Sequence, residues 1–520
     1  MLAIGCAGSQ ALGMQGHSHP NRELLDAAAL CRKLVPEGSV EAFLADHRQE
    51  LFPDELFADL FPSGRGRPSV PSDVIATAMV LQALEGLSDR DAARALRDRI
   101  SWKVASGLAL DDTGFHHSVL TYWRARLRAS ERPERIFDAV RAVVDATGVL
   151  KGKARRALDS TLLDDAVATQ DTVTQLISVI RRVRREVPGA AATVALVAHD
   201  YDAGAKPLIA WDDAVAKEQL VSALVNDALA LIEATESSEL TGSQQDAVGL
   251  LALVAGQDVE PADGEGTWRI ARAVAPDRVI STVDPETRHM HKSRSSYRDG
   301  YKAHISVEPE TGLVTAAALT PANAADGPAG VALIADEDAG LEVLADSAYG
   351  SGEVRAALVK AEHRATIKPI PLRRAIPAGF TLDDFTIDTA DGVVTCPQGV
   401  TVSITRRGSA VFGARCRGCP LRDRCTRSRN GRTIKVHPHH DLLVAARREA
   451  RTGRFQNSYR RHRPMAERSI AWLVAHGHRR VRYRGIARNQ LGLSHRVAAI
   501  NLRRLVNLGL DHDGGWVLAT

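Results

Sequence analysis

Apolar residues recur at helical spacing in the first quarter of the chain. They follow this pattern in segments 73–87, 88–100 and 116–128, and Ser88 with Asp91 three positions later is typical of a helix start. The pattern predicts an all-helical N-terminal domain over residues 21–135. We expect residues 1–20 to form a disordered leader.

A strand pattern follows. The segment "ARRALDSTLL" (154–163) predicts a short strand that ends at Asp159, and residues 300–319 predict a hairpin around "EPETG". Further strands are expected at 342–346 and 364–371, separated by helices. The order of strand, hairpin, helix, strand, helix and strand predicts a mixed α/β sheet flanked by helices. It matches the order of the RNase H-like fold.

Two segments interrupt this order. We assign the core to residues 150–164 and 276–380, a helical and partly acidic insertion to 165–275, and a loop-rich insertion to 381–440. Residues 441–510 predict C-terminal helices. The protein is therefore expected to combine an RNase H-like core of mixed α/β and α+β character with a helical N-terminal domain.

Charge is distributed unevenly. The chain has a net charge of +4, yet residues 401–520 contain 26 Lys and Arg against six Asp and Glu. All these basic residues except Lys435 are Arg, whose planar guanidinium binds phosphate through two hydrogen bonds. A GC-rich genome would explain Arg in place of Lys but not the scarcity of acids. The segment therefore predicts a nucleic-acid partner.

The predicted N-terminal helices also carry basic residues. Short helices joined by tight turns are compatible with a helix-turn-helix-type DNA module. The alternative is a plain helical bundle that mediates contacts between subunits. The basic residues in question are Arg90, Arg94, Arg97 and Arg99.

Two carboxylates occupy equivalent places in the predicted sheet. Asp159 ends "RALD" and Asp346 ends "VLAD", each after an apolar run and before a small polar residue. Ligands bind at strand ends in open α/β sheets. Two neighbouring acids would repel one another unless a cation lay between them, and Mg²⁺ or Mn²⁺ fits such a site. A pair of such ions can activate a nucleophile and stabilise the leaving oxygen in phosphodiester cleavage.

A third acid is expected from a helix beside the sheet. Glu467 is the only acid between Arg451 and Leu510, and we expect it in the first turn of a helix that begins at Pro464. A surface Glu that balances Arg463 is the alternative interpretation. Glu449 is the competing acid.

These residues carry a family resemblance. The segments "LDST" (158–161), "ADSAYGS" (345–351) and "YRRHRPMAERSIAWLV" (459–474) resemble the three acid-bearing motifs of bacterial insertion-sequence DDE transposases. Residues 66–108 and 111–127 resemble the InsH-like N-terminal domain of one subgroup. The resemblance covers about residues 40 to 510.

The resemblance implies roles for individual residues. Asp159, Asp346 and Glu467 correspond to the metal-binding catalytic acids, and Tyr459, Arg463 and Glu467 to the Tyr–Arg–Glu signature around the third acid. The family often has a Lys after the Glu where this chain has Val474, so its role is assigned to Arg479 or Arg480. Tyr349 corresponds to the tyrosine of the second motif, and a core tyrosine is the alternative.

Further basic residues precede the predicted hairpin. The segment "SRSSYRDGYKAH" (293–304) is expected to follow a phosphate backbone. Its basic residues are Arg294, Arg298 and Lys302.

Four of the six cysteines are crowded into the second insertion. Their spacing, C-x19-C-x2-C-x5-C, is reasonable for a structural Zn²⁺ site, and the alternative is four reduced thiols in a DNA-facing loop. The candidate ligands are Cys396, Cys416, Cys419 and Cys425. We expect no further site at His437, His439 and His440.

The function implied is metal-dependent DNA cleavage and strand transfer at the ends of an insertion sequence. Double-stranded DNA is the expected partner, and the enzyme is expected to act as a homo-oligomer. Two alternatives stay open: a catalytically silent DNA-binding relative, and an RNase H-like nuclease. No run of about 18 apolar residues is present, so no membrane span is expected. The cysteine usage favours a reducing cytoplasm.

Overall fold

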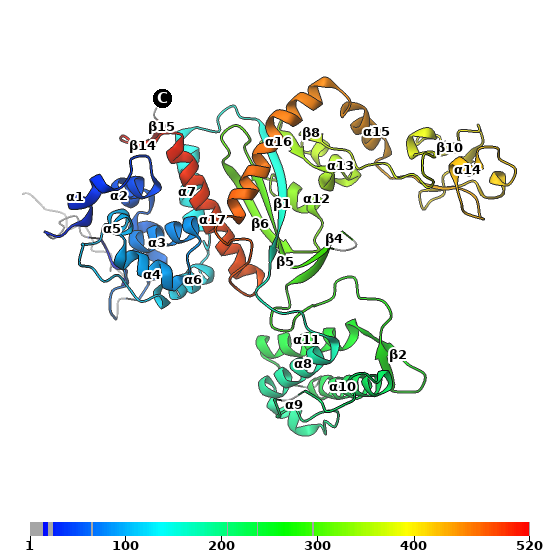
Figure 1. Cartoon of the computed structure of the whole chain (residues 1–520), viewed down its shortest axis with the longest axis horizontal. Helices are drawn as coiled ribbons and strands as arrows, with labels where there is room; N and C mark the ends of the chain where they lie inside the picture. The colour runs from blue at the N-terminus through cyan, green and yellow to red at the C-terminus, as the bar shows by residue number, and fades with distance from the viewer. Residues whose placement is uncertain are drawn as a thin grey trace, which may run out of the picture.

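The computed structural model describes residues 14–18, 24–63, 66–204, 206–236, 238–293 and 296–518. Most of the predicted leader, residues 1–20, lies outside this part of the chain. A central sheet has the N-terminal helices on one side, and two lobes project from the rest of it (Figure 1). No helix among the described residues is long and apolar enough to cross a membrane.

The N-terminal region is helical, as the periodicity predicts. Ser88 accepts a hydrogen bond from the backbone N–H of Asp91 (3.1 Å) and so caps α4. Two 3₁₀ segments, Arg32–Leu34 and Asp54–Leu60, lie between the helices. The helices are α1 (Ala27–Cys31), α2 (Val40–Leu51), α3 (Ser72–Glu85), α4 (Asp89–Asp98), α5 (Ile100–Ser106), α6 (Ser118–Ala129) and α7 (Arg135–Thr147).

The central sheet is mixed. Its order is β4-β5-β1-β7-β8, with β6 also paired to β5, and β1 runs antiparallel to β5 but parallel to β7. The hairpin around "EPETG" is confirmed by the antiparallel pair β5 and β6. The strands are β1 (Arg155–Asp164), β4 (Arg288–Ser293), β5 (Ser296–Val307), β6 (Val314–Pro321), β7 (Glu342–Ala345) and β8 (Arg364–Ile367).

The first strand is longer than its sequence predicts. Pairing of β1 with β5 continues to Asp164 opposite Gly300, so Asp159 lies in the middle of the strand and not at its end. A Cβ on Gly300 would lie 2.1 Å from the carbonyl oxygen of Leu163, so only glycine fits there. Because the two backbones approach so closely at Gly300, β1 and β5 remain paired beyond the polar residues of β1.

Helices cover both faces of the sheet. The side chains of Ala157 on β1 and Leu344 on β7 pack against Ala466 of α16 (Gly453–Val474). Because the two alanine side chains are small, the helix lies close to the sheet. The opposite face carries α12 (Asp326–Ala332) and α13 (Gly352–Lys360). Leu158 and Tyr349 are buried on that second face. Alternation along β1 therefore points Asp159 towards α16.

The N-terminal helices share one hydrophobic core with the sheet and with α17 (Ile486–Asn507). Asn501 of α17 bonds both the N–H and the C=O of Val314 on β6, each at 2.8 Å. The guanidinium of Arg496 is buried and donates to backbone carbonyls of α3 and to those at the end of α16. The N-terminal helices are thus bound firmly to the sheet.

The segment between β1 and β4 forms a separate lobe with its own core. It contains the helices predicted within residues 165–275 and a two-stranded ribbon. Its elements are α8 (Thr172–Glu186), α9 (Pro188–Thr193), α10 (Ala214–Thr235), α11 (Gly242–Gln257), β2 (Val259–Pro261) and β3 (Trp268–Ile270).

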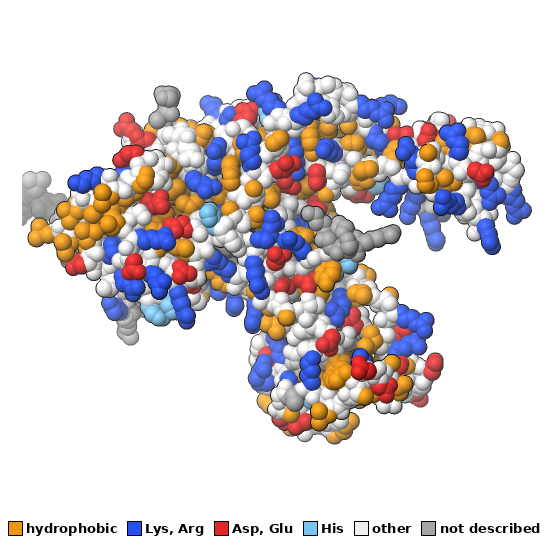
Figure 2. Space-filling model, in the orientation of Figure 1, with side chains coloured by type: hydrophobic (Ala, Val, Ile, Leu, Met, Phe, Trp, Pro, Cys, Tyr) orange, Lys and Arg blue, Asp and Glu red, His pale blue; other side chains and the backbone are white. Residues whose placement is uncertain are grey.

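Residues 381–440, which we call the basic arm, form the second lobe. A small core that includes Phe385, Phe412 and Ile434 holds short strands together. Figure 2 shows Lys and Arg side chains projecting from the lower edge of this lobe. Its elements are β9 (Thr386–Asp388), β10 (Val393–Thr395), β11 (Thr401–Ser403), β12 (Ser409–Val411), α14 (Arg422–Cys425) and β13 (Thr433–Lys435), with 3₁₀ segments at Leu382–Asp384 and Gly413–Cys416. The arm leads into α15 (His440–Glu449), and the chain ends with β14 (Leu510–His512) and β15 (Trp516–Leu518).

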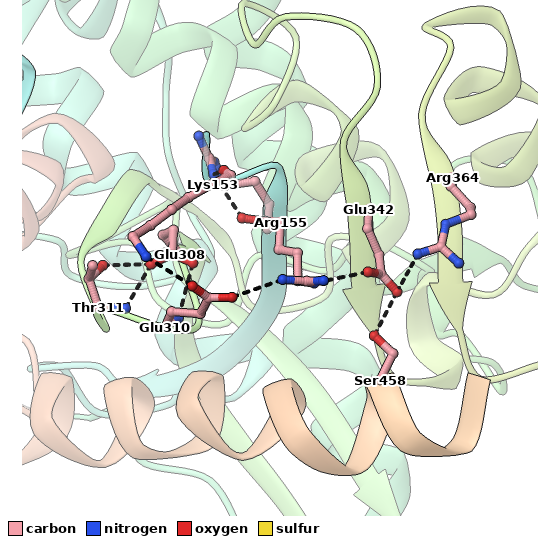
Figure 3. A network of polar contacts seen from close by, with 9 residues as sticks. Lys153, Arg155, Glu308, Glu310, Thr311, Glu342, Arg364 and Ser458 are labelled. Atoms are coloured by element: carbon pink, nitrogen blue, oxygen red, sulfur yellow. Dashed lines mark hydrogen bonds and ion pairs between the residues drawn. The ribbon is translucent and has the colours of Figure 1, made fainter. Parts of the chain in front are cut away.

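A polar network around the buried Glu342 fixes α16 to the sheet (Figure 3). Glu342 at the start of β7 accepts hydrogen bonds from Arg155 of β1 (3.0 Å) and from Ser458 of α16 (2.7 Å), and it pairs with Arg364 of β8 (2.8 Å). Burial opposes ionisation, but the hydrogen bonds from Ser458 and Thr366 and the charge of Arg364 hold the pKa of Glu342 below its usual value. The network therefore sets how the helix crosses β1 and β7.

Candidate active site

Asp159 is the centre of the candidate site. Its carboxylate accepts a hydrogen bond from the N–H of Ser160 (2.9 Å) and pairs with Arg463 of α16, Nη2 to Oδ2 at 2.9 Å. The Asp159 side chain is 15% exposed and that of Arg463 is 6% exposed. The site therefore contains a largely buried ion pair between strand and helix.

Asp346 lies directly after β7, as predicted from the apolar run before it. Its carboxylate accepts a hydrogen bond from the N–H of Ala348 (2.9 Å) and so shapes the turn beyond the strand. Burial raises the pKa of Asp159, Arg463 opposes that rise, and the negative charge of Asp346 adds to it. The two acids are thus near enough to interact electrostatically.

Glu467 approaches the same guanidinium from α16. Its Oε1 lies 4.0 Å from Nη1 of Arg463, and its side chain is 70% exposed. The prediction that Pro464 begins the helix is wrong, because α16 begins at Gly453 and contains Pro464 in its interior. Glu467 therefore lies well inside the helix, one turn after Arg463. Arg463 contacts both Asp159 and Glu467.

Tyr459 and Lys368 complete this face of the site. The Tyr459 ring stacks on Phe455 with centroids 5.8 Å apart, and the Lys368 ammonium lies 4.8 Å from the Tyr459 ring centroid. Lys368 is exposed and follows β8, where its N–H bonds the carbonyl of Ala345, the residue before Asp346. Sequence reasoning missed Lys368. The available signal was its position directly after an apolar strand, the same signal that identified Asp346.

A divalent ion would need these carboxylates to act together. Within the described part of the chain, no group of three or more His, Cys, Asp or Glu side chains is arranged to hold a metal ion. The proposed acids come from a strand, a strand end and a helix, and all three lie near one buried cation, the guanidinium of Arg463. The charge of Asp159 raises the pKa of Arg463 although burial opposes it.

One predicted DNA contact is contradicted. Lys302 is 4% exposed, and its ammonium donates to the carbonyl of Ala324 (2.6 Å) and lies 3.3 Å from Asp326, so it cannot face a phosphate backbone in this structure. The hairpin pairing of β5 turns this side chain towards α12. Arg294, in the same predicted segment, lies outside the described residues.

The other predicted basic residues lie around the end of β1. Arg479 donates to Thr161 (2.6 Å) and to the carbonyl of Leu162 (2.9 Å), and Arg480 donates to the carbonyl of Asp165 (3.0 Å). Arg298 pairs with Asp164 at 3.1 Å and is 45% exposed. These contacts join the C-terminal region to β1, and DNA binding by the three arginines stays a prediction.

Tyr349 is buried between the sheet and α12. Burial raises the pKa of its hydroxyl above the usual range. Tyr349 therefore lies in the hydrophobic core, in agreement with the alternative interpretation given above.

The four cysteines of the basic arm line one cavity of about 260 Å³. All four are free thiols of intermediate exposure, and burial raises the pKa of Cys425. Their sequence spacing therefore does bring Cys396, Cys416, Cys419 and Cys425 to one place, although the thiols do not form a metal-binding set in this structure.

Two family models match this chain. Residues 30–126, which span α1 to α6, match a transposase domain (DUF772), and residues 395–506 match a transposase DDE domain. The second match contains Tyr459, Arg463 and Glu467. These two matches support an insertion-sequence DDE transposase. Comparison of the chain with curated proteins and with solved structures returned no match.

Proposed function

We propose that this transposase cleaves DNA at the ends of its element and transfers the freed 3′ strand ends to target DNA, with Asp159, Asp346 and Glu467 as catalytic acids. The arrangement around Arg463 carries the proposal, because acids that are far apart in the chain gather there in the order that the resemblance implies. The strand order, with two parallel and three antiparallel strand pairs, supports an RNase H-like core.

Asp159, Asp346 and Glu467 are the residues that would hold Mg²⁺ or Mn²⁺. Such ions supply an activated water and stabilise the leaving oxygen in phosphodiester cleavage. Arg463 stabilises the charge of Asp159 when no cation is bound, and Glu467 is exposed enough to turn towards the strand ends. Cleavage at two element ends requires two such sites, so we propose that at least two copies act together on DNA.

The experiment that tests this function is strand cleavage by the purified chain. The substrate is a plasmid that carries the DNA flanking the gene, where the terminal inverted repeats are expected. Cleavage that requires Mg²⁺ or Mn²⁺ and cuts at those repeats is the expected result. A chain that binds this DNA but never cuts it would instead be the silent relative, and cutting of RNA or branched DNA alone would indicate the nuclease.

We propose that Lys368 binds a DNA phosphate beside the acids, in place of the family's missing lysine at Val474. Lys368→Met keeps the apolar stem on Tyr459 but removes the charge, and we expect cleavage to slow about ten-fold, which corresponds to about 1.4 kcal/mol. Lys368→Arg should restore most of the rate, since it restores the cation. Single-turnover cleavage assays on the three proteins measure this. A wild-type rate in Lys368→Met would show that the side chain only packs.

We propose that the four cysteines of the basic arm bind one structural Zn²⁺. Four thiols on one cavity are the ligand type and number that zinc prefers, and binding requires them to move closer together. Metal analysis of the purified chain should give about one zinc per molecule. The double variant Cys416→Ser/Cys419→Ser should contain none and should lose stability in the arm. Absence of zinc from the wild-type protein would refute the proposal.

A further inference from the structure

The basic arm carries more charge than its own structure uses. Residues 401–435 contain ten Lys and Arg and one acid, Asp423. Among the described residues, seven of the ten have no ion pair, no side-chain hydrogen bond and no cation–π contact, and six of the seven are arginines. The seven, all exposed, are Arg406, Arg407, Arg415, Arg417, Arg427, Arg429 and Lys435.

The acids at the start of the arm do not neutralise these cations. Asp383 pairs with Arg447 of α15, Asp384 accepts from the N–H and hydroxyl of Thr381, and Asp388 accepts from two backbone N–H groups of the following turn. Their carboxylates therefore stabilise the base and turns of the arm. The arginines beyond them repel one another without local compensation.

The arm is anchored at its base. His437 contacts Glu353 of α13 (2.9 Å), and Arg447 of α15 binds Asp383 (2.6 Å). The chain enters the arm after Lys368 and returns through α15 into α16, which carries Tyr459 and Glu467. The arm thus leaves from, and returns to, the two elements that flank the candidate active site.

We propose that the basic arm is a binding surface for the phosphate backbone of double-stranded DNA, which extends the contact beyond the active site. The inference builds on the proposed function, because that function makes duplex DNA the polyanion near these strand ends. Exposed guanidiniums bind phosphates through paired hydrogen bonds and read no sequence. Figure 2 shows that such side chains gather along one edge of the arm, as contact with a continuous backbone requires.

The test is the salt dependence of binding to a labelled DNA duplex of arbitrary sequence. Arg427→Gln/Arg429→Gln removes two of the unpaired charges and should lower the slope of log K against log salt by about 1.8, at about 0.9 per phosphate contact. The matched control, Arg185→Gln/Arg272→Gln, removes two exposed arginines of the helical lobe and should leave the slope unchanged. Both variants should unfold at the wild-type temperature, because the substituted side chains are exposed.

The outcomes are distinguishable. An unchanged slope in the arm variant, with normal cleavage by the wild-type chain, would overturn the inference but not the proposed function. An equal decrease of the slope in the arm variant and in the control would show a general charge effect and would also overturn the inference. Weaker binding of duplex RNA but not of duplex DNA by the arm variant would assign the surface to RNA. A wild-type chain that binds duplex DNA without cutting it would contradict only the proposed function.

Discussion

Asp159→Asn and Asp346→Asn will each bind DNA with near wild-type affinity and lose strand cleavage by at least about 1,000-fold. Asparagine keeps the shape of the side chain but removes the charge needed to hold a divalent cation. Asp159→Asn also leaves the buried guanidinium of Arg463 without its carboxylate and should lower stability, so Asp346→Asn is the cleaner of the two variants. Cleavage of the plasmid substrate and binding to labelled DNA are measured on the same preparations.

Glu449→Gln is the matched control for these acids. Glu449 was the competing candidate for the third acid, and it pairs with Arg454 at 3.2 Å with 36% of its side chain exposed. Neutralising it should leave cleavage within about two-fold of wild type, since an exposed pair of this kind contributes little. Normal cutting by Asp346→Asn would show that the proposed acids are wrong.

Arg496→Met will lower the free energy of unfolding by about 2–5 kcal/mol, because buried carbonyls lose a donor at about 1–3 kcal/mol for each group left unpaired. The Arg496 guanidinium is 2% exposed and bonds the carbonyls of Ala83 and Leu84 at the end of α3 and those of Trp472 and Leu473 at the end of α16. Burial and the charge of Arg503 lower its pKa to about 10. Methionine fills much of the space but leaves the carbonyls of Leu84 and Leu473 without their side-chain donor, whereas His478 and the N–H of Ala475 still contact those of Ala83 and Trp472.

Denaturant unfolding of the purified variant measures this loss. Arg488→Met, on the exposed first turn of the same helix, is the control and should change stability by less than about 0.5 kcal/mol. Equal stability of the two variants would mean that Arg496 does not join the N-terminal helices to the rest of the protein.

The sequence predicted those features that local patterns determine. The hairpin of β5 and β6, the position of Asp346 after a short apolar strand and the capped start of α4 follow from residues within a few positions. The extent of β1 does not, because its continuation past Asp159 depends on pairing with β5, more than a hundred residues later. For the same reason the sequence placed Asp159 at the end of its strand, whereas it lies in the middle.

Other features depend on contacts that no local pattern contains. Pro464 is tolerated within α16, whereas the sequence predicted a helix start there. Lys302 was expected to face DNA, but the packing of α12 against β5 buries it. The pairing of Arg463 with Asp159 and the shared core of α17 with the N-terminal helices require segments that are hundreds of residues apart.

Replacement of Mg²⁺ by Fe²⁺ tests most directly whether the three acids share one metal site. Bound Fe²⁺ generates hydroxyl radicals under peroxide and ascorbate, and these cut the polypeptide near the ion. The account predicts cuts in three segments, around residues 159, 346 and 467, all of which disappear in Asp346→Asn. Cuts in only one or two of these segments, or a pattern that persists in Asp346→Asn, would contradict it.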